Sequence, residues 1–522
     1  MRTKNSVLNV VVGIFSLLIT TITGFVLSKI FITNMGIEKN GLNSLFINVM
    51  SILSISELGI AGAINYNLYK PILNRDYTKV SIIMTFYKKC YRVIGSLILV
   101  MSIIMAFFIN NFIKGSTLSE KYIIIAFLLF SLNTITTYFF AYARNLLYGF
   151  QQVFIASAVD FFSKLLKTIL QIFLIIKYKN YYLYLIVNVI FDLLANIIIY
   201  LLCRKKFPLI SFNEEKRDKK LENQVFHDVK SLSVIQVTNA VINFTDSIII
   251  SKFVGIIQTG LFANYKLIVS QLNNLINTVF NGLGASIGNL LAENNEKRVK
   301  INLVNLQYFC FFLGTVCFSG ILLFTQPFIT LWIGKEYLLS FSVVILIAIN
   351  LYITVQRQVI TYFLRTGGYH NRMIIPTIIE AILNFIISIV LVFKYDVIGV
   401  LIGTVFSAIF GFFANSILLY RIYKFNYLKY IVRQIKFILY SVIILIITKL
   451  IFSLFNFSVL LNFVLMLITY MIVVIIIFVI IFMIEPDLLS IRDSIQYKLK
   501  VYRGRKKYEK SNVSFWNATR SD

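Results

Sequence analysis

The sequence is poor in charged residues, and poorest in acids. Only 14% of its 522 residues are charged, with 22 Asp and Glu against 50 Lys and Arg. A soluble globular chain is about 25% charged and about 45–50% apolar, whereas 58% of this chain is hydrophobic. Soluble cores stop growing with chain length and split into domains, so a larger core cannot bury this excess. Lipid must therefore be the solvent around much of the chain.

Cysteine and histidine are also scarce, with four and two residues. The cysteines lie in or at the ends of apolar segments, no CxxC pair occurs, and the histidines are far apart. This spacing predicts neither a disulfide framework nor a metal centre, and we expect no cofactor. The sequence has no GxxxxGK[ST] phosphate loop, which excludes a fused ATP-driven motor. The first apolar run is too long for a cleavable signal and is expected to be the first span.

What the sequence has is long apolar runs, each close to the ~20 residues that a transmembrane helix needs. They predict an all-α polytopic membrane protein of about fourteen transmembrane helices. The runs cover residues 6–33, 41–66, 91–113, 121–147, 152–176, 181–203, 231–254, 259–291, 301–324, 337–364, 373–393, 397–420, 431–452 and 459–484.

Basic residues alternate between the loops. With the N-terminus inside, 36 of the 50 basic residues fall on the inner side, 9 on the outer side and 5 within helices. This bias predicts a multi-pass protein with both termini in the cytoplasm. The net charge of +28 is then mainly a topology signal, and we expect no nucleic-acid partner. Every outer loop is short, which argues against a membrane polymerase or glycosyltransferase, and we expect no enzyme activity.

Two short motifs recur at equivalent places. Gly36 to Leu42 and Gly255 to Leu261 both read Gly-Ile-x-x-x-Gly-Leu, and Lys-Tyr recurs at 177–178 and 394–395. Such repeats are typical of secondary transporters. They predict two pseudo-symmetric six-helix lobes with appended parts: an N-terminal lobe at 1–203, a cytoplasmic linker at 204–230, a C-terminal lobe at 231–422, two further helices within 423–484 and a basic cytoplasmic tail at 485–522.

Charged residues within apolar runs are costly and face a bundle interior or water. Asp160, Lys164 and Lys167 share one face of a helix at ~12, ~18 and ~22 Å from its start, at ~1.5 Å per residue. They form either a self-paired structural cluster or a cationic wall for an anionic substrate. Lys266 begins a second polar stripe with Asn273, Asn277 and Asn281. This stripe either packs against another helix or lines a substrate cavity, to which Arg357 is a further candidate contributor.

Four acids are candidates for ion coupling: Glu57, Asp246, Asp160 and Glu380. A carboxylate in an apolar helix can carry a proton or bind Na⁺, or can form a salt bridge with a lysine of the cavity. The sequence leaves these alternatives open.

Several segments resemble polysaccharide repeat-unit flippases. They are Asp246 to Gly255 continuing through Gly260-Leu-Phe-Ala-Asn-Tyr-Lys266, then Ala285 to Lys297, Glu380 to Ser388 leading to Gly399 to Thr404, and Gly36 to Gly41 with Glu57-Leu-Gly59. Their order and spacing cover most of the chain. The family is a branch of the superfamily that includes multidrug extruders and lipid II flippases.

The resemblance implies a bacterial cytoplasmic-membrane transporter that flips undecaprenyl-diphosphate-linked oligosaccharide units by alternating access, with H⁺ or Na⁺ coupling, for capsule, exopolysaccharide or O-antigen-type synthesis. Membrane lipids, a polysaccharide polymerase and glycosyltransferases are the implied partners. The alternatives are a cation-coupled multidrug antiporter, whose cavity should be dominated by acids, and a flippase for another lipid-linked cell-wall precursor.

Overall fold

The computed structural model describes residues 2–54, 60–213, 219, 237–293, 295–453 and 459–485. These described residues form helices and connecting turns, without a β-strand. The first seven helices are α1 (Arg2–Met35), α2 (Ile37–Leu53), α3 (Ile60–Leu73), α4 (Tyr77–Phe108), α5 (Glu120–Gly149), α6 (Val153–Tyr178) and α7 (Tyr181–Lys206).

The remaining described helices begin at residue 237. A helix at residues 237–249 continues into the π-helical turn η3 (Ile250–Val254), and is followed by α9 (Ile256–Ala292), α10 (Glu296–Trp332), α11 (Phe341–Thr366), α12 (His370–Tyr423), α13 (Tyr427–Phe452) and α14 (Val459–Ile484). In the part of the chain that is described, nine helices are long and apolar enough to cross a membrane. The predicted class, an all-α polytopic membrane protein, is confirmed.

Three of the predicted runs take a different form in the structure. The run at 41–66 is divided between α2 and α3, whereas the runs at 373–393 and 397–420 are joined in α12. Asp396 interrupts α12 with φ of 50° and ψ of −132°, so the chain reverses there and two spans result. Short polar side chains cap several helices; Asp76 accepts from the backbone N–H of Lys79 at 2.9 Å at the start of α4.

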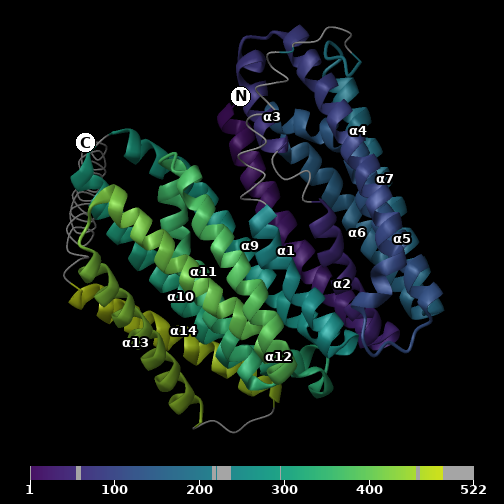
Figure 1. The fold of residues 1–522 in the computed structure, drawn as a ribbon. Coiled ribbons are helices and arrows are strands. Elements are labelled where there is room, and N and C mark those ends of the chain that lie inside the picture. The colour runs from purple at the N-terminus through teal and green to yellow at the C-terminus, as the bar shows by residue number, and fades with distance from the viewer. Residues whose placement is uncertain are drawn as a thin grey trace, which may run out of the picture. The chain divides into compact units, whose positions relative to one another are not determined.

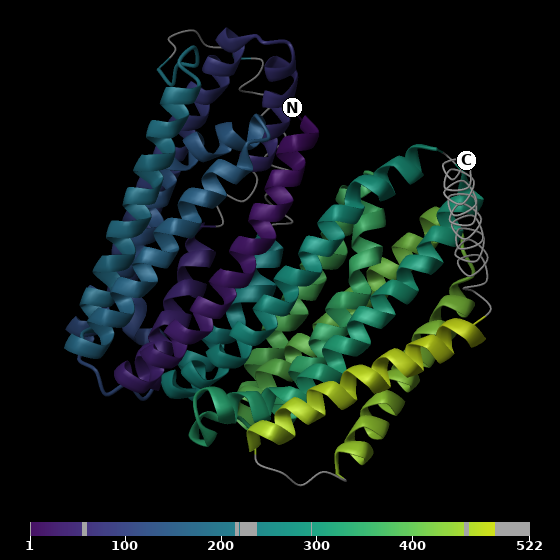
Figure 2. The same ribbon diagram turned by 180° about the vertical axis from the view of Figure 1, so that it is seen from behind.

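The described chain divides into two compact units. Unit 1 comprises Met1–Asn277, Phe328–Asn350 and Tyr369–Asn415, and unit 2 comprises Thr278–Pro327, Leu351–Gly368 and Ser416–Asp522. Within unit 1, α5 packs against α4 and α7, and α1 packs against α6 (Figure 1). Figure 2 shows the same helices from behind. The predicted lobes at 1–203 and 231–422 stay a prediction.

The core of each unit is rich in aromatic side chains. In unit 1, buried Tyr87 donates a hydrogen bond to Tyr91 at 3.1 Å and also binds the amide of Asn145. In unit 2, Phe311 of α10 stacks on Phe437 of α13 with ring centroids 4.1 Å apart. Because lipid tails are as apolar as these side chains, packing and interhelical hydrogen bonds hold the bundle together more than apolar burial does.

The two copies of the glycine motif meet within unit 1. A Cβ on Gly41 of α2 would collide with the carbonyl oxygen of Ile256, and a Cβ on Gly260 of α9 would collide with that of Ile37. The amide of Asn40 donates to the carbonyl of Gly260 at 3.0 Å. Only glycine permits this close crossing of backbones, which explains why the motif carries glycine in both copies.

Candidate functional site

The strongest candidate site is a buried polar cluster in unit 1, centred on Asp246. This residue lies in the helix at 237–249 with 6% of its surface exposed. One carboxylate oxygen, Oδ2, accepts a hydrogen bond from the hydroxyl of Thr404 at 3.0 Å. The other, Oδ1, is buried and has no hydrogen-bond partner among the described residues. An ionised carboxylate in this setting is costly unless a cation or a proton neutralises it.

Polar side chains of α12 continue this hydrogen bond into a network. The amide of Asn384 donates to the hydroxyl of Thr404 at 3.2 Å and lies 3.4 Å from that of Ser407, while its Oδ1 lies 3.4 Å from the hydroxyl of Thr245. Glu380, only 2% exposed, lies one helical turn before Asn384. The structure therefore brings a carboxylate, an amide and three hydroxyls into one buried network, with a second predicted acid on the adjoining turn.

The backbone of α12 brings its two halves together at this point. A Cβ on Gly403 would collide with Ser388, and a Cβ on Gly399 with the carbonyl of Leu391. These glycines, spaced four residues apart, let the segments before and after Asp396 approach closely. Thr404, which follows Gly403 directly, is thereby placed against Asn384 of the other half.

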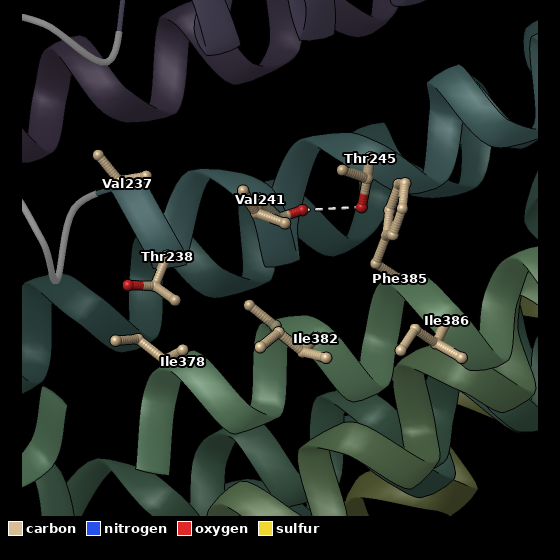
Figure 3. Close-up of a pocket in the computed structure, with 9 residues that line it drawn as sticks. Val237, Thr238, Val241, Thr245, Ile378, Ile382, Phe385 and Ile386 are labelled. Atoms are coloured by element: carbon tan, nitrogen blue, oxygen red, sulfur yellow. Dashed lines mark hydrogen bonds between the residues drawn. The ribbon is translucent and has the colours of Figure 1, made fainter. Parts of the chain in front are cut away.

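An apolar pocket of about 750 Å³ opens beside the cluster (Figure 3). Figure 3 shows that it is formed by the helix at 237–249 on one side and the first half of α12 on the other. Thr245 belongs to both features, since it lines the pocket and bonds to Asn384 while donating to the carbonyl of Val241 at 2.7 Å. Apart from Thr245 and Thr238, the residues that line the pocket are apolar.

Lys266 of α9 lies against the same stretch of helix. Its ammonium group donates to the carbonyl of Asn243 at 3.2 Å and lies 3.4 Å from the hydroxyl of Ser247. Both partners flank Asp246 in the helix, so the predicted base and the predicted acid lie close together. A positive charge here favours the ionised carboxylate and lowers the cost of its burial.

The three charges of α6 are not paired with one another. The guanidinium of Arg144 on α5 makes two hydrogen bonds to the carboxylate of Asp160, and a third to Asn196 of α7 at 3.2 Å. Lys167 pairs with Asp192 of α7 at 2.7 Å, and its side chain is 15% exposed. Lys164, on the face between them, is exposed. The three charges therefore do not form the self-paired cluster; Lys167 is held in an ion pair and Lys164 is the more exposed of the two lysines. The cationic wall for an anionic substrate stays a prediction.

Arg144 is a residue that the sequence analysis missed. It lies near the end of the apolar run at 121–147 and is one of the 36 basic residues assigned to the inner side, whereas the structure places it within α5. The short gap between the apolar runs could have predicted this pair, because the turn at 150–152 makes α5 and α6 neighbours and so brings their facing charges together.

The other predicted residues are distributed between the units. Asn273 is half-buried and Asn277 exposed in unit 1, whereas Asn281 and half-buried Arg357 belong to unit 2. Asn281 accepts a hydrogen bond from the hydroxyl of Tyr362 at 2.6 Å. Glu57 lies outside the described residues.

The donor set around Asp246 suits a monovalent cation. The described residues contain no group of three or more His, Cys, Asp or Glu that would hold a transition metal. Carboxylate, hydroxyl, amide and backbone carbonyl oxygens are the ligands that transporters use for Na⁺, and a carboxylate can alternatively take up H⁺.

The sequence matches no protein-family model and no curated protein. Solved structures do share its fold. A lipid II flippase, MurJ, in an inward closed conformation matches with a TM-score of 0.68 and 18% identity over 91% of this chain and 99% of its own. An inward-facing MATE-family multidrug resistance transporter of the MOP superfamily matches with a TM-score of 0.63 and 15% identity over 78% of this chain and 96% of its own.

A Vibrio cholerae MATE transporter matches with a TM-score of 0.56 and 11% identity over 80% of this chain and 97% of its own. The fold is that of MOP-superfamily transporters. The MurJ match extends over more of the chain than either MATE match.

Proposed function

We propose that this protein flips an undecaprenyl-diphosphate-linked oligosaccharide across the bacterial cytoplasmic membrane by alternating access, driven by a monovalent cation. The buried Asp246 cluster carries the proposal, because a purely structural bundle has no need of a carboxylate oxygen that is buried without a hydrogen-bond partner. Binding of Na⁺ or H⁺ at this carboxylate would couple the ion gradient to the movement of the helices that form the cluster.

The chemistry of the substrate is consistent with the placement of bases. A diphosphate cannot cross ~30 Å of hydrocarbon unaided. Lys164 is an exposed residue of α6 that could meet it, while Lys167 and Arg144 are held by Asp192 and Asp160. No covalent step is needed, since the substrate only changes sides. A lipid II flippase and multidrug transporters both share the fold, so the bases within the apolar helices are what favours an anionic, lipid-linked substrate over a cationic drug.

Reconstitution tests the substrate. Proteoliposomes that contain the protein and a fluorescent undecaprenyl-diphosphate oligosaccharide are given an inward or outward Na⁺ or H⁺ gradient, and substrate that changes leaflet is measured by an external glycosidase. We expect gradient-dependent flipping, reduced at least tenfold by Lys164→Gln, since a hydrogen bond to a charged group contributes about 1.5–3 kcal/mol and a factor of ten is about 1.36 kcal/mol. Lys177→Gln, on the last turn of the same helix, is the matched control.

The outcome separates the alternatives. Efflux of a cationic dye without flipping would favour the multidrug antiporter, and flipping of lipid II in preference to the repeat unit would favour another cell-wall precursor. Normal flipping by Lys164→Gln would overturn the role of α6. We further propose that glycosyltransferases supply the substrate and that a polymerase consumes it, which adjacency of their genes would support.

A further inference from the structure

Lys266 of α9 lies beside Asp246 in unit 1 without bonding to its carboxylate. An ammonium has three N–H groups, and the described residues give it two acceptors, the carbonyl of Asn243 at 3.2 Å and the hydroxyl of Ser247 at 3.4 Å. The ring of Phe262, one turn earlier in α9, lies 5.8 Å from the ammonium nitrogen. All three groups are neutral, although the carboxylate lies between two of them in the sequence.

The carboxylate of Asp246 is unsatisfied in the complementary way. Its Oδ2 accepts from Thr404 at 3.0 Å, whereas its Oδ1 has no hydrogen-bond partner among the described residues. Because both partners of Lys266 flank Asp246 on one helix, the ammonium is held within a turn of that oxygen. Lysine has a flexible four-carbon stem, so a change of rotamer would carry its charge from the neutral oxygens towards Oδ1.

The positive charge that this acid needs has two possible sources. The other side chains that bond within the cluster are neutral: Thr404, Asn384, Ser407 and Thr245. Glu380, one turn before Asn384 in α12, is a second acid and supplies no positive charge. The charge therefore comes from Lys266 or from a bound cation. Two cations close to one buried oxygen repel each other strongly, so that each weakens the binding of the other.

We propose, on the basis of the cation-driven transport inferred above, that Lys266 competes with the transported cation for Asp246. When the cation takes Oδ1, the ammonium is held by Asn243 and Ser247; when the cation leaves, the ammonium moves to Oδ1 and the buried carboxylate keeps a counter-charge. A transported ion must leave its site as well as enter it, and the competing ammonium makes release easier. Lys266 then sets the affinity for the ion, whereas the sequence made it a candidate for contact with the substrate.

Na⁺ titrations of the purified full-length protein test this competition. Thermal unfolding is followed while NaCl replaces N-methylglucamine chloride at constant ionic strength, and the Na⁺ concentration that gives half of the stabilisation is determined. In Lys266→Gln this concentration should fall by roughly tenfold or more, because two like charges about 6 Å apart at an effective dielectric constant of about 20 repel by more than the 1.36 kcal/mol that equals a factor of ten. The glutamine amide can still donate to Asn243 and Ser247.

The variant also makes a prediction about stability. Without Na⁺, Lys266→Gln has no counter-charge for Asp246 and should unfold at a lower temperature than the wild type. Saturating Na⁺ should remove most of this difference, because the bound cation then supplies the charge in both proteins. A lysine needed only for packing would leave a defect that Na⁺ does not repair.

Three control variants separate charge, place and packing. Lys266→Arg keeps the charge and should bind Na⁺ as weakly as the wild type. Lys252→Gln removes the same charge from an exposed residue of η3, which continues the helix of Asp246, and should change the half-saturating concentration by less than about twofold, since exposed charges are screened. Lys266→Gln combined with Asp246→Asn should show no stabilisation by Na⁺.

The outcomes distinguish this proposal from the proposed function. Unchanged or weaker Na⁺ binding in Lys266→Gln, an equal gain in Lys252→Gln, or a Lys266→Gln protein that stays unfolded in saturating Na⁺ would each overturn the competition. No response to Na⁺ in either the wild type or Lys266→Gln would overturn it as well, while flipping would still be decided by the proteoliposome assay. Tighter Na⁺ binding in Lys266→Gln, together with a wild type that flips no lipid-linked oligosaccharide, would uphold the competition and overturn the proposed function.

Discussion

Replacing Asp246 by asparagine separates the ion-coupling role from a structural one. Asparagine has the same shape and its carbonyl oxygen can still accept the hydrogen bond from Thr404. The charge, however, is lost. If Asp246 binds a cation, the variant should lose every effect of that cation on stability while its own fold remains intact.

The magnitudes follow from the burial of the carboxylate. A buried acceptor without a partner costs about 1–3 kcal/mol, and Oδ1 of Asp246 is such an atom among the described residues. Asparagine leaves an unpartnered amide at that position and removes the negative charge beside Lys266, so we expect Asp246→Asn to be about 1–3 kcal/mol less stable than the wild type when no binding cation is present. At one hundred times its dissociation constant, a bound cation adds about 2.7 kcal/mol to the wild type and nothing to the variant.

The assay is thermal unfolding of the purified protein in NaCl and in N-methylglucamine chloride at equal ionic strength. Asp396→Asn is the matched control, because Asp396 is an exposed aspartate of α12, the helix that supplies Asn384 and Thr404, and its φ of 50° suits asparagine as well as aspartate. A Na⁺-dependent shift that persists in Asp246→Asn would refute the assignment of the cation to this carboxylate. If Na⁺ has no effect on the wild type, repeating the comparison across pH tests H⁺.

Three further predictions concern packing and charge. Gly41→Ala should destabilise the protein by about 1–3 kcal/mol in chemical unfolding, because its Cβ meets the backbone of α9, whereas Gly24→Ala, with open space around it, should have no such effect. Burial raises the pKa of Glu38, but hydrogen bonds from Ser116 and Thr117 lower it by more, so that it lies below its ordinary value of 4.5. The wild type should therefore be more stable than Glu38→Gln at neutral pH, and this difference in stability should vanish as the pH falls below 4.5 through the lowered pKa. A difference that grows in acid would contradict this. A double-mutant cycle on Arg144→Gln and Asp160→Asn should give a coupling of about 1–2 kcal/mol, reduced from the value for a fully buried pair because the Asp160 side chain is 44% exposed; additive effects would show that the pair is not coupled.

The sequence predicted most of the helices because apolarity and membrane burial coincide. It predicted their ends less well. The run at 91–113 begins fourteen residues after the start of α4 at Tyr77, since Lys79, Lys88 and Lys89 interrupt the apolar pattern without interrupting the helix. Apolarity marks the part of a helix that lies in lipid, whereas backbone hydrogen bonds continue into the aqueous phase.

Single charges in apolar runs were found from the sequence, but their partners were not. Asp246 is conspicuous because an acid in such a run is costly. Thr404 and Asn384, which complete the cluster, lie about 140–160 residues further along the chain. Threonine and asparagine are common at helix contacts in membranes and also bond to their own backbone, so their types alone do not predict a ligand. Only the reversal of α12 at Asp396 brings them to the carboxylate.

The recurring motifs gain a physical explanation from the structure. Gly36 and Gly255, which open the two copies of the glycine motif, both have positive φ, at 89° and 147°. The second glycines, Gly41 and Gly260, then pack reciprocally, each against the backbone turn that the other copy provides. A contact of this reciprocal form is what a pseudo-two-fold axis between duplicated segments produces.

The second motif behaves in the same way. Lys177-Tyr178 is followed by Lys179 with φ of 47°, and Lys394-Tyr395 is followed by Asp396 with φ of 50°. Each copy thus ends one helix and reverses the chain into the next, although the first reversal is a separate turn and the second is a break within α12. Positive φ is uncommon outside glycine and follows both Lys-Tyr pairs, although ψ differs between them, at 34° for Lys179 and −132° for Asp396. Among the described residues, the second segment places Asp246 against the reversed helix pair of α12, whereas the charges of the first segment are used in the pairs of α5, α6 and α7.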